Sequence, residues 1–563
     1  MEVSTRSLGA VYRKSVHPSE VLAPLTPAPA PVFQVEILDG GEVLFEKDHA
    51  IPMRDGIKLY ADILRPVDSV AKVTPTIVFF GPFGKHGAVP RELFKNMDVD
   101  FSKLSRYTKW ELPDPLLWCG KYEYSFVIVD PRGTWWSEGD AAHYLSPEEG
   151  RDGYDVVEWV AKRPWSSGKV GWGAVSYFAM SAYQTAVLHP PHLAAIMPWE
   201  GISDLYREVN TVGGMPNLAF QHMWMNLTGN GLHECEDHAV ASIEHPLYDT
   251  WWQSKVVDWS QIHIPAFSVT GWSSLGLHLR GTIEAWNKFS SEKKYLWVHA
   301  GREWSEYYKD ANVQKQKLFW DRFLKGRANE VDSWAPVEIA VRLTAENYTR
   351  RSETTFPPSK THLSKFWITG ERTLWPAPPR PNESSPASLS YTSHHADSNL
   401  SFEYVFKEST EITGHSSVKL WIQAMNYPDA DLYLALQKLD ISGNEVKFFH
   451  SSQQVEAPAT LGWLRVSHRE LDPERSTPGR PYHKHARRQW LRPRDIVPVE
   501  VELWPQSTLW EKGETMRLVI QGKSFTDPEN PTQAKSPVHG FGEVKVWYGG
   551  EYDSTLLVPI IKG

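Results

Sequence analysis

The sequence is short of cysteine, of long apolar runs and of net charge. Only two of its 563 residues are cysteines, Cys119 and Cys235, which excludes a disulfide framework or a C-x-x-C metal site. No stretch approaches the roughly 18 apolar residues of a membrane-spanning helix, and the first residues lack a signal-peptide core. The net charge of −9 argues against a nucleic-acid surface. We therefore expect a cytoplasmic protein with a small-molecule substrate and neither nucleic acid nor membrane as partner; no pattern indicates an oligomeric state.

Cofactor motifs are missing as well. The segment Asp130-Pro-Arg-Gly133 lacks the spacing of a dinucleotide fingerprint, and no P-loop occurs. Histidines, cysteines and acidic residues do not gather at the spacing of metal ligands. The sequence therefore predicts no cofactor and no metal. Tryptophan, by contrast, is abundant at 26 residues, which leaves room for an aromatic-lined pocket.

The chain is too long for a single core, and its patterns divide it. Residues 1–40 contain a proline-rich run and predict an extended N-terminal arm. Strands alternate with helices over residues 41–335, interrupted at about 200–255 by short helical segments that are typical of a cap over a pocket. Residues 336–563 hold short alternating strands without helices, which predicts a β-sandwich. The fold class is accordingly α/β followed by a β-sandwich.

The strongest local pattern surrounds Ser176. Lys169 to Trp172 predicts a short buried strand, Tyr177 to Leu188 predicts a helix, and Ser176 falls on the sharp turn between them. This is the context of a nucleophile elbow, in which the turn lifts a serine hydroxyl above the sheet and the helix N-terminus faces developing negative charge. The usual G-x-S-x-G signature is altered to Ala174 and Phe178 at the glycine positions. A serine that merely caps a helix is the structural alternative.

Further segments resemble one known family. They are Val127–Gly139, Asp152–Val160, Pro190–Trp199, Ser203–Tyr206, Asp429–Leu436 and Gly462–His468. With the elbow, they resemble the cocaine-esterase and X-prolyl dipeptidyl-peptidase (CocE/NonD) family of α/β-hydrolases over most of the chain from about Glu42 onward. The resemblance implies an α/β-hydrolase domain with a helical cap, followed by a jelly-roll β-sandwich.

The resemblance also implies an oxyanion-binding loop after the strand Thr76–Phe80. In the family this loop carries a tyrosine whose hydroxyl helps to hold the oxyanion, and the matching residue here is Phe83, which offers no donor. One such donor is typically worth about 10²–10³ in rate. The backbone N–H of Tyr177 could still serve, and Lys85 or His86 could contribute a donor. Lys85 and His86 could equally be exposed loop residues without a role.

Both partners of the family's serine are replaced. The family ends one strand in Gly-Trp-x-Asp, and this aspartate orients the catalytic histidine. Here the strand ends in Gly271-Trp-Ser-Ser274, so that Ser274 follows Trp272 where the acid would stand. The position of the histidine falls at Arg302 or Glu303. A serine hydroxyl is a poor nucleophile without a base, and the base needs an orienting partner.

Three replacements are possible. His278 lies one helical turn beyond Ser274 and has an ordinary pKa suited to a base. Glu303 stands where the family presents its base, and Trp304 and Trp272 could supply the dry surroundings that raise a carboxyl pKa. We favour Glu303 narrowly as the base. The third possibility is that Ser176 is not a nucleophile.

One predicted cap segment, Leu218 to Leu227, gathers apolar and aromatic side chains. Of these, Phe220 and Trp224 are candidates to line the substrate pocket, although a cap helix must also bury one face against the core.

Three classes of function fit these patterns. The first is a hydrolase or acyltransferase that acts through Ser176 on an ester, amide or lactone of a small molecule, as in secondary-metabolite biosynthesis. The second is a non-hydrolytic enzyme on the same fold, such as a cyclase, isomerase or lyase. The third is a binding protein without catalysis. Fold alone does not choose among them.

Overall fold

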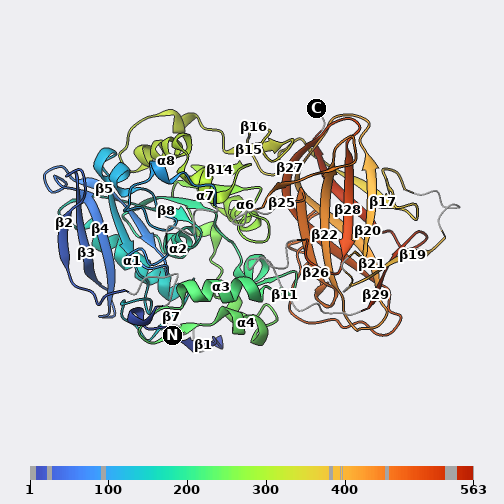
Figure 1. Ribbon diagram of the computed structural model, residues 1–563, viewed down its shortest axis with the longest axis horizontal. Helices are drawn as coiled ribbons and strands as arrows, with labels where there is room; N and C mark the ends of the chain where they lie inside the picture. Colours follow the sequence, from blue (N-terminus) through green and yellow to red (C-terminus); the bar gives the residue numbers. More distant parts are fainter. Residues whose placement is uncertain are drawn as a thin grey trace.

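A computed structural model describes residues 8–21, 28–90, 97–378, 385–393, 395, 397–450, 456–525 and 542–561. Two bodies lie side by side along its long axis: a body of mixed helices and strands, and a body built of strands (Figure 1). Much of the predicted N-terminal arm is described, but residues 1–7 and 22–27 lie outside the described residues.

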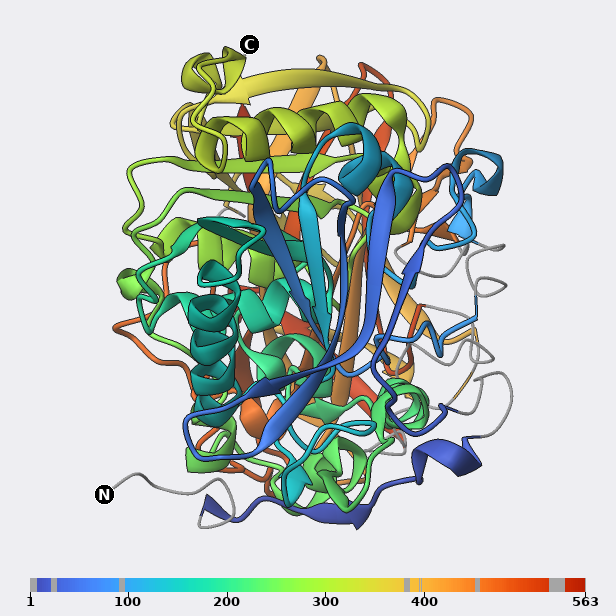
Figure 2. The same ribbon diagram turned by 90° about the vertical axis from the view of Figure 1, so that its left-hand side faces the viewer.

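The first body is organised by one twisted sheet with the order β2-β3-β4-β6-β5-β8-β9-β13-β14-β15-β16. The strands from β6 to β15 are parallel, and β16 returns antiparallel. Figure 2 looks onto the end of this sheet where β2 to β4 lie. The bounds are β2 Gln34–Ile37, β3 Val43–Pro52, β4 Lys58–Pro66, β5 Thr74–Phe80, β6 Ser125–Val129, β8 Ser166–Val175, β9 Leu193–Trp199, β13 Ala266–Gly271, β14 Lys294–His299, β15 Val337–Arg342 and β16 Tyr348–Glu353.

Helices cover both faces of this sheet. Trp172 of β8 belongs to one buried cluster with Val156 and Val160 of α1, so α1 lies on that face. On the other face Gly171 leaves room for Trp320 of α8, because a Cβ at this glycine would lie 2.6 Å from the indole ring. The helices are α1 Pro147–Ala161, α2 Tyr177–Ala186, α6 Leu279–Lys288, α7 Glu303–Tyr308 and α8 Asp310–Phe323.

The insertion after β9 is helical, as the sequence predicts for a cap. It contains a π-helix at Tyr206–Asn210, the hairpin strands β10 Thr211–Val212 and β11 Met215–Pro216, and α3 Leu218–Thr228, β12 Glu234–Glu236, α4 His238–Glu244 and α5 Thr250–Gln253. The N-terminal segment runs beside it: β1 Tyr12–Lys14 pairs with β12, which pairs in turn with β7 Ala141–Ala142 (Figure 1). The arm is therefore anchored by strand pairing at β1, and again at β2.

The second body is a β-sandwich with its own core of buried aliphatic and aromatic side chains. One layer pairs β18-β17-β30-β21-β27, with β29 and β19 continuing beside β21, and the other pairs β20-β28-β22-β26. The strands are β17 Thr361–Ile368, β18 Leu374–Trp375, β19 Ala387–Thr392, β20 Asn399–Val405, β21 Thr410–Ala424, β22 Asp431–Leu439, β26 Thr460–Arg465, β27 Val497–Trp510, β28 Thr515–Gln521, β29 Glu543–Tyr548 and β30 Thr555–Ile561.

The predicted domain boundary at residues 335–336 does not coincide with the end of the first sheet. β15, which the sequence pattern assigned to the sandwich, pairs in parallel with β14 and so continues the first sheet. The physical reason is that an alternating strand pattern predicts a half-buried strand but does not say which sheet it joins. The first sheet therefore extends to Glu353 of β16.

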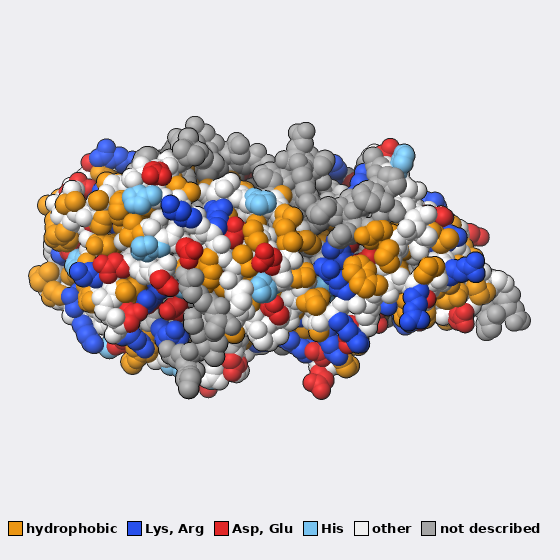
Figure 3. Space-filling model, turned by 90° about the horizontal axis from the view of Figure 1, so that it is seen from below, with side chains coloured by type: hydrophobic (Ala, Val, Ile, Leu, Met, Phe, Trp, Pro, Cys, Tyr) orange, Lys and Arg blue, Asp and Glu red, His pale blue; other side chains and the backbone are white. Residues whose placement is uncertain are grey.

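The charge of the surface and the length of the helices bear on whether nucleic acid or a membrane could be a partner. On the face seen from below, acidic and basic side chains lie interspersed over the first body (Figure 3). Among the described residues, no helix is both long enough and apolar enough to cross a membrane.

Candidate active site

Ser176 stands at a strained turn between β8 and α2. Its backbone has φ 58° and ψ −118°, and its N–H donates to the carbonyl of Trp199 at 3.0 Å. Ala174, at the first glycine position of the altered signature, has φ 108°, a region that favours glycine. Such backbone geometry persists only where the surrounding structure enforces it. The local conformation is thus that of a nucleophile elbow.

The second altered position is accommodated by a glycine directly after the neighbouring strand β5. The ring of Phe178 lies over Gly81, where an added Cβ would come within 2.8 Å of the phenyl ring. Phe178 also packs edge-on against Phe79, with ring centroids 6.5 Å apart. The large residue that the signature excludes is therefore tolerated because Gly81 has no side chain.

His278 places its imidazole between Ser176 and a pair of acids. It directly precedes α6, and its backbone N–H donates to Ser274 Oγ at 3.3 Å. Its Nε2 lies 3.4 Å from Ser176 Oγ, and the side chain is buried. Ser274, at the position where the resemblance predicts an aspartate, therefore supports the turn that presents this histidine.

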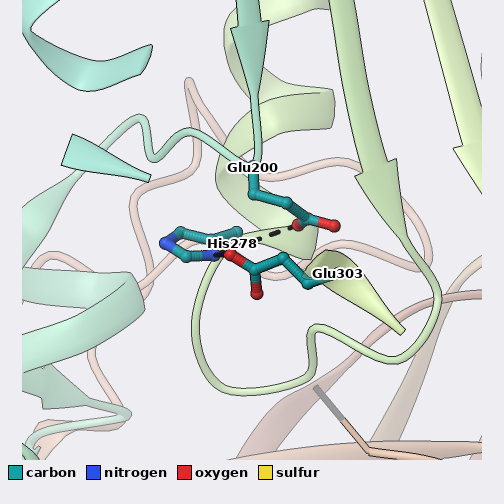
Figure 4. A group of neighbouring side chains, drawn as sticks. All are labelled: Glu200, His278 and Glu303. Carbon is teal, nitrogen blue, oxygen red and sulfur yellow. Dashed lines mark ion pairs between the residues drawn. The ribbon is translucent and has the colours of Figure 1, made fainter. Parts of the chain in front are cut away.

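Two glutamates lie on the far side of the imidazole (Figure 4). His278 Nδ1 is 3.4 Å from Glu303 Oε1 and 3.9 Å from Glu200 Oε2. Glu200 is held in place, because its carboxylate accepts hydrogen bonds from Thr270 Oγ1 and from the N–H of Gly271, both at 2.7 Å. Both carboxylate oxygens of Glu303 and Nδ1 of His278 lack a hydrogen bond within the described structure. These are the groups free to bond to one another.

Burial perturbs all three groups. It lowers the pKa of His278 to about 4, against the opposing effect of Glu200, because the charged imidazolium is costly in a dry site. Burial raises the pKa of Glu303 to about 8, partly offset by His299. Burial and the neighbouring Glu303 raise the pKa of Glu200 as well. Perturbed groups gathered in this way are a mark of functional sites.

The order of these residues along the chain is unusual for the fold. α/β-Hydrolases present their triad as serine, then acid, then histidine. Here the loop after β13 carries His278, and the loop after β14 carries Glu303, so histidine and acid have exchanged loops. A triad is defined by geometry rather than by chain order, so this order is compatible with one.

Sequence reasoning singled out His278 and Glu303 but treated them as rivals, and it overlooked Glu200. One signal was present. Glu200 directly follows the buried strand β9 at the carboxyl edge of the sheet, where open α/β sheets gather their functional side chains.

The same three groups bear on metal binding. Among the described residues, Glu200, His278 and Glu303 are the one set of histidine and acidic groups placed to hold an ion, with ligand atoms within 4.8 Å of one another. An imidazole nitrogen and two carboxylate oxygens are donors that suit Zn²⁺. The sequence predicted no metal, because the three residues are far apart in the chain.

The residues predicted around the oxyanion lie in different places. The ring of Phe83 is buried against Tyr177 and Phe178. Lys85 is buried and forms ion pairs with Asp48 and Asp62, the latter at 3.0 Å.

His86 and Trp272 are likewise occupied elsewhere. His86 packs edge-on against Trp135 with ring centroids 4.5 Å apart. Trp272 donates its indole N–H to the carbonyl of Ala340 at 2.6 Å. Lys85 is thus buried and His86 half-buried, and neither lines the cavity at Ser176.

That cavity lies between Ser176 and the inserted helices. Phe220 and Trp224 of α3 line it, as predicted, and the ring of Tyr177 stacks on Trp224 with centroids 6.1 Å apart. The backbone N–H of Tyr177 is the first of α2, and such a group has no acceptor within its own helix. The remaining lining residues are Leu145, Met180, Leu205, Val209, Asn210, Gln221, His238, Leu277 and His278.

Comparison with known proteins identifies the family of this chain. The family model of the X-Pro dipeptidyl-peptidase (S15 family) matches residues 55–242, and that of the X-Pro dipeptidyl-peptidase C-terminal non-catalytic domain matches residues 329–557. The crystal structure of a CocE/NonD family hydrolase from Staphylococcus aureus is 33% identical, with a TM-score of 0.86 over 100% of this chain and 99% of that one. This chain belongs to the CocE/NonD family of hydrolases.

Other relatives of this CocE/NonD chain are more distant or match over less of their length. The cocaine esterase of Rhodococcus sp. is 32% identical over 183 residues, which span 32% of this chain but only 28% of that esterase. An α-amino acid ester hydrolase is 17% identical, with a TM-score of 0.69 over 96% of this chain and 100% of that one, which shows a likeness of fold alone.

Proposed function

We propose that this protein is a serine hydrolase that cleaves esters of small, uncharged and largely apolar molecules. The observation that carries the proposal is the single imidazole of His278, which faces Ser176 Oγ with one nitrogen and Glu303 with the other. Ser176 is the nucleophile, His278 takes its proton as the general base, and Glu303 orients the imidazole.

The assignment reverses the sequence-based preference for Glu303 as the base. His278 Nε2 is within 3.4 Å of the hydroxyl, a distance that shortens readily when substrate binds, whereas Glu303 lies behind the ring. Glu200, fixed at 3.9 Å from the same nitrogen, is a second acid that can share the positive charge formed on His278.

The oxyanion would be held first by the backbone N–H of Tyr177 at the start of α2. An N–H next to the nucleophile is the usual first donor of this fold, and the helix N-terminus adds a partial positive charge. Because Phe83 has no donor on its side chain, the second donor has to come from the backbone of the loop after β5.

The lining of the cavity supports an uncharged ester. None of the described side chains that line it is ionised at neutral pH, because burial lowers the pKa of both His238 and His278, and most of the lining is aliphatic or aromatic. A dipeptidyl peptidase has to bind a free N-terminal ammonium, and burying that charge without a carboxylate partner is costly. An ester without an ionised group therefore suits this cavity better. A role in small-molecule biosynthesis and a cytoplasmic location stay predictions from the sequence.

The test is hydrolysis of 4-nitrophenyl butyrate by the full chain. We expect Ser176→Ala and His278→Ala each to lower kcat by at least about 10³-fold, as for other triads. Ser167→Ala on the exposed start of β8 and His222→Ala on the exposed face of α3 are matched controls and should retain wild-type rates. Activity that survives Ser176→Ala would refute the nucleophile and with it the proposal.

A further inference from the structure

His238 is a second histidine in the cavity of Ser176, and the proposed reaction does not use it. It is the first residue of α4 in the inserted region, is 2% exposed, and lines the same cavity as Ser176 and His278. Its ring stacks on Trp224 with centroids 5.3 Å apart and an angle of 13° between the planes.

A buried ion pair lies beside Nε2 of His238. Nε2 of His238 lies 3.5 Å from Glu236 Oε2, and Lys255 Nζ contacts the same oxygen at 2.7 Å. Burial alone would raise the pKa of Glu236, but Lys255 and His238 together lower it to about 2, so the carboxylate is ionised. Burial lowers the pKa of His238, so the imidazole is neutral near pH 7. An ionised carboxylate beside Nε2 favours the proton on that nitrogen and leaves Nδ1 as an acceptor.

The other polar groups of the cavity wall are largely committed. Tyr177 donates its hydroxyl to Glu149 at 2.8 Å and accepts from the N–H of Leu145 at 3.1 Å. Gln221 Nε2 donates to Asn210 Oδ1 at 3.0 Å, and Asn210 Nδ2 donates to Ser242 Oγ at 3.4 Å. His238 adds an acceptor to this wall at Nδ1, and the amides of Gln221 and Asn210 each have a second N–H beyond the one used.

We propose that His238 determines substrate specificity by accepting a hydrogen bond from a hydroxyl or N–H group carried by an otherwise apolar ester. The inference rests on the proposed function, since it names a feature of the substrate that Ser176 attacks. The described lining of the cavity holds no carboxylate to pair an ammonium, so the preferred donor is neutral. A site built around such an acceptor discriminates against the analogue that lacks the donor.

Paired esters test the proposal directly. In each pair of 4-nitrophenyl esters a hydroxyl replaces a methyl group at one position: mandelate against 2-phenylpropanoate, and 4-(hydroxymethyl)benzoate against 4-ethylbenzoate. The readout is the ratio of kcat/KM between the two members. We expect the wild type to prefer the hydroxyl member of at least one pair by about tenfold, the size of one hydrogen bond.

Three variants separate recognition from packing. His238→Phe keeps a ring against Trp224 but removes the acceptor, and we expect its ratio to fall to about one. His238→Asn carries an amide at the position of Nδ1, and we expect it to restore part of the preference. His222→Phe, at an exposed histidine of α3, is the matched control and should keep the wild-type ratio.

The result that overturns the inference is a wild-type ratio near one in both pairs, or a preference that persists in His238→Phe. Failure of the proposed function looks different: Ser176→Ala would then hydrolyse both members of a pair as fast as the wild type.

Discussion

The pH dependence of ester hydrolysis probes the two acids behind His278. The productive form needs a neutral His278 to accept the serine proton and an ionised Glu303 to orient it. The groups that face Glu303 are His278, His299, Glu200 and Glu111. Because the pKa of Glu303 is raised to about 8 and that of His278 is lowered to about 4, the pair titrates in two separate steps.

The magnitude follows from these values. With a pKa of about 8, roughly one-tenth of Glu303 is ionised at pH 7, so kcat/KM should rise about tenfold between pH 7 and pH 9. A second loss should begin only below about pH 5, as His278 takes up a proton. The assay is 4-nitrophenyl ester hydrolysis from about pH 5 to about pH 9.5, read where both forms of nitrophenol absorb equally.

Glu303→Gln removes the group that causes the upper step. We expect the variant to lose about 10²–10⁴ in kcat/KM and to show no rise near pH 8, since glutamine does not ionise. Glu292→Gln, at an exposed glutamate, is the matched control and should keep the wild-type profile. A wild-type profile that is flat from pH 6 to pH 9, or a rise that persists in Glu303→Gln, would refute the reasoning.

Four further outcomes are expected. Ala174→Gly relieves the backbone at φ 108° and should raise the free energy of unfolding by about 0.5–1 kcal/mol in denaturant titration; a decrease would contradict the strain. Lys85→Met leaves buried Asp48 without its ion-pair partner, although Asp62 keeps Lys109 at 3.0 Å, and should cost about 3–5 kcal/mol; an unchanged melting temperature would show that the ion pairs of Lys85 contribute nothing. Folding raises the pKa of Glu303 from 4.5 to about 8, so between these pH values Glu303 binds a proton in the folded state but not in the unfolded state. The free energy of unfolding that Glu303 contributes therefore falls as the pH rises from 4.5 to about 8. Glu303→Gln should therefore raise the melting temperature more at pH 9 than at pH 5. Dialysis against a chelator should leave ester hydrolysis unchanged, and loss of activity restored by Zn²⁺ would favour a metal at the acids around His278.

Sequence reasoning located the chemistry but not its arrangement. Ser176 could be placed because strand, turn and helix are local patterns with a known consequence. His278 and Glu303 could be named because each follows a buried strand, yet their contact joins two loops whose side-chain directions no spacing determines. The tolerance of Phe178 depends on Gly81, almost a hundred residues earlier, which only packing reveals.

The sequence could not fully predict the boundary between the two bodies or the contacts of the oxyanion loop, for the same reason. β15 has the pattern of a sandwich strand, but its register with β14 is a tertiary property. Lys85 could be either an oxyanion donor or an exposed loop lysine on sequence alone, because the acids that bury it come from β3 and β4. Long-range partners of this kind override local composition.

Covalent labelling tests the central claim most directly. A fluorophosphonate should modify the full chain once, at Ser176, as read by intact mass and by mapping of the labelled peptide. The rate of labelling should fall by at least about 10²-fold in His278→Ala, because the hydroxyl loses its base, and should be unchanged in His222→Ala. Labelling that is absent from the active wild type, or equally fast in His278→Ala, would contradict a nucleophilic Ser176 activated by His278.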